Sequence, residues 1–218
     1  MPSLQAFPAI TKDEFSEACK ALERRSADRI SDTDWLSVKW SGEELLIRQR
    51  RNITTSLHNG NRRLAGDRST NSGEVVDRED LENMVEDEVE DSSIKDTTCL
   101  IVDFSIILSP TYCVPVLWFS CRHGLEKRPI ALDQVYEQLV PQPSCAPLRG
   151  VGVLGGISVA HHPVSDLPSF FLHPCNTQDA LSVLEPSGTL TPEEYLSLWL
   201  GLIGSAVGLH IPSKLLSA

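Results

Sequence analysis

The strongest constraint on the fold is a pair of apolar runs separated by a short turn. Residues 97–108 are rich in β-branched and aromatic side chains, and residues 114–121 repeat that character after Ser109-Pro110-Thr111. Two such runs joined by a turn predict an antiparallel hairpin, and their near-continuous apolar character places it in the middle of a sheet. Pro115 stands near the start of the second run, where a missing N–H is tolerated.

Helix signals lie towards both ends of the chain. Thr11 and Glu14 have the spacing of a capping box, and an apolar face repeats over roughly residues 12–25. Thr191 and Glu194 repeat the same capping signature before an apolar segment. The other predicted elements are strands at 34–40, 44–49 and 157–160, and a helix at 132–139.

Strands grouped in hairpins with helices at both ends predict an α+β domain with an antiparallel sheet. The 218 residues, 41 % of them hydrophobic, suffice for one domain with its own core. Between residues 50 and 96 the periodicity fades into a basic block followed by an acidic one, which is typical of a solvated insertion. Residues 141–156 are rich in proline and glycine and predict a loop. We expect a single domain over residues 1–218 with a flexible charged insertion at 50–96.

Charge and hydropathy exclude some partners. A formal net charge of −11 argues against nucleic acid or an anionic membrane surface as the main partner. No basic segment followed by an apolar one comes after Met1, so we expect no signal peptide. The most apolar stretch, 195–211, is shorter than the ~20 residues that a membrane-spanning helix needs. The expectation is a cytoplasmic protein with no integral membrane segment.

The six cysteines show no C-x-x-C spacing, which argues against a zinc or redox motif of that type. Four of them fall within apolar patterns, and we interpret these as small buried hydrophobic residues. The four are Cys19, Cys99, Cys113 and Cys121.

Cys175 follows an apolar run, residues 168–172, that predicts a strand ending at a proline. A cysteine at a strand end can meet other proteins, and its thiolate can carry an acyl group without a metal or a cofactor. Pro174 fixes the backbone before it. Asn176 and Thr177 offer side-chain hydrogen bonds to the loop or to a tetrahedral oxyanion.

Three other interpretations of Cys175 remain open on residue types and spacing. With His161, His162 or His173 it would form a cysteine-protease dyad, although no protease signature surrounds it. The same four residues would bind zinc, although adjacent histidines on an extended segment point to opposite faces. A buried structural cysteine is the default on spacing alone.

Several ordered motifs resemble the autophagocytosis-associated family of ubiquitin-like-conjugating enzymes. Residues 170–177, Phe-Phe-Leu-His-Pro-Cys-x-Thr, resemble its active-site signature, and His162-Pro163 has a counterpart upstream of the cysteine. Residues 112–119, Tyr-x-Val-Pro-Val-Leu-Trp-Phe, resemble its central strand, and residues 129–136 its following helix. Residues 195–209 are similar to the C-terminal helix of one branch of the family.

The resemblance implies a ubiquitin-conjugating-enzyme-like fold, with an antiparallel sheet of about four strands between N-terminal and C-terminal helices. It implies an autophagy enzyme in which Cys175 accepts a ubiquitin-like modifier as a thioester and passes it to an acceptor lysine, forming an isopeptide bond. The implied partners are an activating enzyme (autophagy-related protein seven), a modifier (autophagy-related protein twelve) and an acceptor (autophagy-related protein five). These partners would also recruit it to the pre-autophagosomal membrane. No cofactor or metal is implied.

Within this resemblance Tyr112 matches a tyrosine near the active cysteine of one branch. It is a candidate for positioning the lysine or the oxyanion, while a core aromatic at a strand end is the competing interpretation. The His-Pro-Asn triplet of ordinary ubiquitin-conjugating enzymes is not found, so oxyanion support must come from elsewhere. The alternative for the whole chain is a non-catalytic protein-binding module on the same fold with an inert loop cysteine. The implied site comprises the catalytic Cys175, with His173, Pro174, Asn176 and Thr177 supporting its loop.

Overall fold

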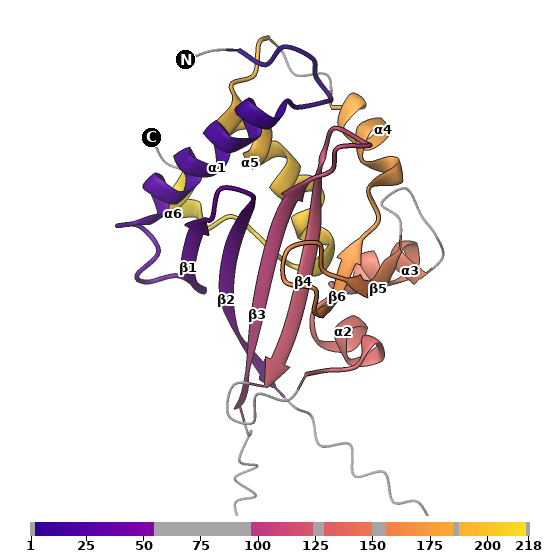
Figure 1. Ribbon diagram of the computed structural model, residues 1–218. Coiled ribbons are helices and arrows are strands. Elements are labelled where there is room, and N and C mark those ends of the chain that lie inside the picture. The colour runs from indigo at the N-terminus through magenta and orange to yellow at the C-terminus, as the bar shows by residue number, and fades with distance from the viewer. Residues whose placement is uncertain (1–2, 55–96, 124–128, 150–155, 185–187, 217–218) are drawn as a thin grey trace, which may run out of the picture. The chain divides into compact units, whose positions relative to one another are not determined.

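Six strands pair into one sheet in the order β1-β2-β3-β4-β6-β5 (Figure 1). The computed structural model describes residues 3–54, 97–123, 129–149, 156–184 and 188–216. The α+β class and the antiparallel hairpins are as predicted, and the strand count of about four is corrected to six. The strands are β1 Trp35–Trp40, β2 Glu44–Thr54, β3 Thr97–Leu108, β4 Pro115–His123, β5 Ile157–His161 and β6 Pro168–Leu172.

The two strands beyond the implied four are those predicted at 157–160 and 168–172, and they form the hairpin that leads to Cys175. Strand β6 pairs with β4 so that Phe171 stands opposite Trp118 and Phe170 opposite Phe119. The first pair of rings stacks with centroids 4.6 Å apart and the second with centroids 5.5 Å apart. Cross-strand aromatic pairs of this kind stabilise a sheet. They attach β6 to the central hairpin, and β5 then pairs with β6 along its whole length.

Helix α1, Lys12–Ser26, and helix α5, Pro192–Leu202, pack against each other, and α1 also packs on β1 (Figure 1). Both predicted capping boxes are confirmed. The backbone N–H of Glu14 donates to Thr11 Oγ1 at 3.3 Å while Glu14 Oε2 accepts the Thr11 N–H at 2.9 Å. The remaining helices are α2 Leu132–Gln138, α3 Gln142–Arg149, η1 Pro174–Asn176, α4 Thr177–Ser182, η2 Gly204–Val207 and α6 Ser213–Leu216.

Helix α3 lies where a loop was predicted. Pro143 falls in its first turn, where no intrahelical amide bond is lost. Leu148 is buried, and Cys145 Sγ lies 3.6 Å from the carbonyl oxygen of Tyr136 on α2. Packing against α2 therefore decides the conformation, because tertiary contacts override weak local propensity.

The predicted insertion begins later than expected. Strand β2 runs on to Thr54, so residues 50–54 are strand, and the remainder of the 50–96 prediction lies outside the described residues. Arg51 on this last part of β2 donates to the carbonyl oxygens of Leu139 at 3.2 Å and Val207 at 3.4 Å. It also donates to Gly208, whose φ of 67° and missing side chain leave room for the guanidinium group. The end of β2 is thus fixed to the chain after α2 and to the chain after α5.

The cysteine prediction holds for two residues of four. Cys19 and Cys121 are buried, Cys99 is half-buried, and Cys113 is exposed. Cys113 closes the β3–β4 turn with a φ of 51°, and its carbonyl accepts the Ile10 N–H at 2.9 Å. The prediction for Cys113 was wrong because Cys113 lies in the turn, before β4 begins at Pro115. Across the described ranges, no helix has the length and apolarity to cross a membrane.

Candidate active site

Cys175 is exposed and lies in the 3-10 turn η1, which follows the end of β6 at Leu172 and runs directly into α4. The sequence predicted an open loop after the proline, so the helical continuation was missed. Pro174 occupies the first position of the turn, where its missing N–H costs no hydrogen bond. The thiol is therefore held on a short helical segment at the end of a sheet strand.

His173 caps this turn with its imidazole ring. The Cys175 N–H donates to His173 Nδ1 at 3.2 Å, so Nδ1 must be unprotonated for the bond to exist. This role at a helix start usually falls to Ser, Thr, Asp or Asn. The bond acts on the backbone of Cys175 and gives the ring no hydrogen bond to the thiol.

The other predicted loop residues differ in exposure. Pro174 and Thr177 are buried, and the Thr177 N–H donates to the Pro174 carbonyl to close the turn. Asn176 is half-buried and begins α4 without a side-chain cap to the helix amides. Pro174 and Thr177 thus face the protein interior.

Tyr112 reaches the cysteine turn from the β3–β4 turn. Its ring lies edge-on to the His173 ring with centroids 6.0 Å apart, and His173 also lies 6.2 Å from Phe171. Gln178 Nε2 on α4 donates to the Tyr112 carbonyl at 2.6 Å. Gln178 was missed by sequence reasoning, because its place beside Tyr112 depends on a helix that was not predicted. Together these contacts bring the Tyr112 turn and the Cys175 turn side by side.

His161 and His162 are engaged elsewhere. His162 is buried, and its Nδ1 accepts the N–H groups of Val164 and Ser165 at 3.3 and 3.2 Å. Burial lowers the pKa of His162, partly opposed by the negative charge of Glu44. His161 Nδ1 lies 3.0 Å from the backbone oxygen of Asp166. Within the described ranges neither ring is hydrogen-bonded to Cys175, so the structure gives the dyad interpretation no support from them.

His162 instead secures the β5–β6 loop across the outer face of the sheet. Its Nε2 lies 3.5 Å from Glu44 Oε2 on β2, and its ring lies edge-on to Trp118 with centroids 5.4 Å apart. The Ser105 hydroxyl donates to the same carboxylate oxygen of Glu44. In Figure 1 this orange loop passes in front of β4. Among the described residues no three His, Cys, Asp or Glu side chains gather as a metal site, so the zinc interpretation has no cluster to rest on.

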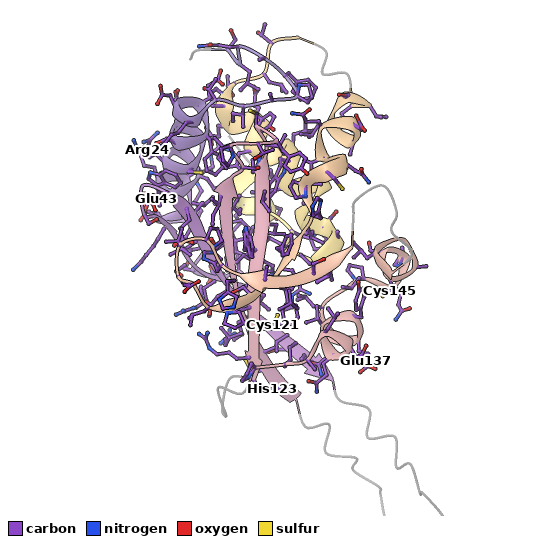
Figure 2. The ribbon with its side chains drawn as sticks, turned by 45° about the vertical axis from the view of Figure 1, so that its right-hand side comes forward. Arg24, Glu43, Cys121, His123, Glu137 and Cys145 are labelled. Carbon is purple, nitrogen blue, oxygen red and sulfur yellow. The ribbon has the colours of Figure 1, made fainter. Side chains whose placement is uncertain are left out.

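The remaining thiols have different surroundings. Burial raises the pKa of the Cys19 thiol, and it raises the pKa of Cys121 to about 12. Figure 2 shows Cys121 within the sheet and Cys145 out on α3. Because the thiolate is the nucleophile, Cys19 and Cys121 are chemically inert in the folded protein. Cys175 and Cys113 are the exposed thiols of the six.

Comparisons with known proteins show the family of this chain. A family model described as "Autophagocytosis associated protein, active-site domain" matches residues 14–214. A protein of Gibberella zeae named ubiquitin-like-conjugating enzyme ATG10 is 33 % identical over 235 residues, covering 98 % of each chain. Proteins of the same name from Arabidopsis thaliana and Homo sapiens are 35 % and 32 % identical over 123 and 113 residues. These two matches cover 53 % and 50 % of this chain, and 52 % and 50 % of the relatives.

Proposed function

We propose that Cys175 carries the ubiquitin-like modifier as a thioester. This chain belongs to the autophagocytosis-associated family of ubiquitin-like-conjugating enzymes, whose reaction needs such a cysteine. One observation carries the assignment. Cys175 is an exposed thiol on a capped turn at a strand end, within the residues that resemble the family's active-site signature. An accessible thiolate is what acyl transfer requires of the enzyme.

The reaction proceeds in two acyl transfers. The Cys175 thiolate attacks the thioester that joins the C-terminal glycine of the modifier to the activating enzyme. A new C–S bond forms, and the cysteine of the activating enzyme leaves as a thiolate. An acceptor lysine amine then attacks the new thioester and the C–N bond forms. The C–S bond breaks, and the departing Cys175 sulfur takes the proton that the nitrogen loses. The proposed partners are autophagy-related proteins seven, twelve and five, as activating enzyme, modifier and acceptor.

We assign supporting roles to the neighbours of Cys175. The His173 ring holds the Cys175 amide, and the buried Pro174 and Thr177 fix the turn beneath it. Asn176 is the candidate donor to the oxyanion of the tetrahedral intermediate. Tyr112 positions the incoming lysine or that oxyanion, a role supported by its contact with His173.

The wider proposals concern organisation and place of action. We propose one conjugating-enzyme domain over residues 1–218 in which the charged 55–96 segment is an insertion between β2 and β3. These strands are neighbours in the sheet, so the segment leaves and rejoins the domain at adjacent strands. The enzyme acts in the cytoplasm and reaches the pre-autophagosomal membrane through its protein partners.

A reconstituted assay tests the assignment of Cys175. The chain is incubated with activating enzyme, ATP and modifier, and adducts are separated with and without reductant. We expect a reductant-sensitive adduct, which Cys175→Ser converts into a reductant-resistant oxygen ester. Cys113→Ser is the matched control, since it removes the other exposed thiol and should leave the thioester intact. Absence of both adducts would favour the non-catalytic binding module and overturn the proposal.

The same assay tests Tyr112 when the preformed thioester is followed during discharge. If the Tyr112 hydroxyl positions the lysine, Tyr112→Phe should slow transfer to lysine about tenfold while loading, which involves no lysine, changes little. Equal losses in loading and discharge would instead indicate that Tyr112 acts on the oxyanion, which forms in both steps, or on folding, and an unchanged melting temperature would distinguish the first from the second.

A further inference from the structure

Asp179 shares the exposed face of the helical segment that carries Cys175. The turn η1 runs into α4 without a break, and Asp179 is four residues after Cys175. Side chains four apart on an α-helix lie on one face, and Cys175 stands in the 3-10 turn directly before α4. The exposure pattern agrees, because Thr177, Ala180 and Leu181 are buried while Cys175 and Asp179 are exposed.

The Asp179 carboxylate has no structural partner. It makes no hydrogen bond or ion pair with any residue in the described ranges. Glu14 in α1 and Glu194 in α5 occupy the same third helical position, and both fold back onto the amide of their cap residue. Asp179 is one methylene shorter and leaves the Asn176 amide alone. Between residues 168 and 184 it is the only acidic side chain, so the negative charge of this segment belongs to Asp179.

The second acyl transfer needs a proton acceptor, because a lysine arrives as an ammonium ion and only the free amine attacks a thioester. In each of the three histidines considered as partners of Cys175, Nδ1 is already engaged. His173 Nδ1 accepts the Cys175 N–H, His162 Nδ1 accepts two loop amides, and His161 Nδ1 lies against the backbone oxygen of Asp166. An exposed, unpaired carboxylate on the thiol's own face meets the requirement.

We infer that Asp179 is a catalytic residue that binds the ammonium group of the acceptor lysine and takes its proton as the amine attacks. The inference rests on the proposed role of Cys175. One proton passes from the ammonium nitrogen to the Asp179 carboxylate, and the freed amine forms the C–N bond with the thioester carbonyl. The tetrahedral oxyanion collapses, the C–S bond breaks, and the departing Cys175 sulfur takes the second proton from the nitrogen. The carboxylic acid of Asp179 then returns its proton to solvent.

The test uses a preformed thioester, freed of activating enzyme and ATP, and two small nucleophiles. Free L-lysine must lose a proton before it attacks, whereas hydroxylamine is already neutral at pH 7. For Asp179→Asn we expect unchanged loading, unchanged discharge to hydroxylamine, and discharge to lysine slowed by about tenfold to a hundredfold. The lysine deficit should shrink towards pH 10, where the lysine amine loses its proton in solution. Asp179→Glu should recover most of the rate.

A matched control separates this role from helix electrostatics, since a first-turn aspartate also suits the helix dipole. Asp133 is an exposed first-turn aspartate in α2, which lies at the other end of β4 from α4 in Figure 1. Asp133→Asn makes the same charge change and should leave both discharge rates unaltered.

Two results would overturn the inference. One is wild-type discharge to lysine by Asp179→Asn. The other is an equal loss for lysine and hydroxylamine, which would mean that the substitution only distorts the turn. A wild-type chain that forms no thioester would contradict the assignment of Cys175 itself, and this failure is visible before any nucleophile is added.

Discussion

The starts of α1 and α5 differ instructively from the start of the helical segment that carries Cys175. In both framework helices a threonine and a glutamate three residues later satisfy each other's backbone amides, with N···O distances of 2.8–3.3 Å. At the cysteine turn the cap is the ring of His173, and the carboxylate of Asp179 is left unengaged. The framework helices use both polar side chains to fix their starts, whereas at the cysteine turn His173 alone does so and Asp179 is left exposed.

The same contrast extends to the acidity of the two framework glutamates. Burial works to raise the pKa of Glu14, but hydrogen bonds from Thr11 and Gln5 outweigh it and the pKa is lowered. Hydrogen bonds from Thr191 lower the pKa of Glu194 as well. Both carboxylates are therefore stabilised in their charged form by backbone amides, which ties them to the folded state.

The largest effect that would sharpen the comparison is expected at His173. His173→Ala removes the acceptor of the Cys175 N–H, and an N-cap is worth about 1 kcal/mol. We expect thioester formation to slow about fivefold to tenfold, since 1.36 kcal/mol corresponds to a factor of ten in rate. Single-turnover loading measures this effect.

His173→Asn supplies another capping side chain and should restore most of the loading rate. A large fall in melting temperature with unchanged loading would break the comparison, because the cap would then serve the framework and not the thiol.

A smaller effect, of the opposite kind, is expected at Thr191. Thr191→Ala opens the capping box of α5 and should lower the free energy of unfolding by about 1 kcal/mol. For a chain of this size that corresponds to a fall of roughly 2–4 °C in melting temperature. Loading and discharge should stay at wild-type rates once the assay temperature is well below the transition, and Thr191→Ser should behave as wild type.

The smallest effect is expected at Glu14, in the stability of the fold at acidic pH. A carboxyl group with a lowered pKa in the folded state contributes stability above its unfolded pKa of about 4.3 and loses that contribution as pH falls through its folded value. Glu14→Gln should therefore flatten the dependence of unfolding free energy on pH below about pH 5. Denaturant titrations between pH 7 and pH 3 measure this dependence. Parallel curves for the variant and the wild type would show that the Glu14 hydrogen bonds do not contribute to the pH dependence of stability.

Much of the fold could be predicted because its elements carry strong local signals. The capping residues of α1 and α5 and the apolar runs of β3 and β4 each specify their structure within a few residues. The missed features depend on distant partners. Helix α3, which was not predicted, forms because Leu148 is buried and Cys145 contacts α2. Strand β6 was predicted, but its pairing with β4 through ring stacking was not. No local pattern encodes either contact.

In the candidate site, too, residues with a local sequence signal were predicted and residues placed by distant contacts were not. Cys175 was singled out because a strand end and a proline precede it. Gln178 and Asp179 were not, because α4 has only six residues and no apolar repeat long enough to predict a helix. The contact between Tyr112 and His173 joins two turns about 60 residues apart in the chain, and only pairing through β4 and β6 brings them together.

The exposed Cys113 offers a site in the β3–β4 turn for attaching a fluorescent dye. All six cysteines lie in the described ranges, and Cys113 and Cys175 are the exposed ones. In a Cys175→Ser chain a maleimide dye would therefore attach preferentially at Cys113, one residue from Tyr112. Because Gln178 fastens this turn to α4, the dye would be held beside the active-site turn. Its emission would follow the arrival of the modifier in real time, as the oxygen ester forms on the substituted serine.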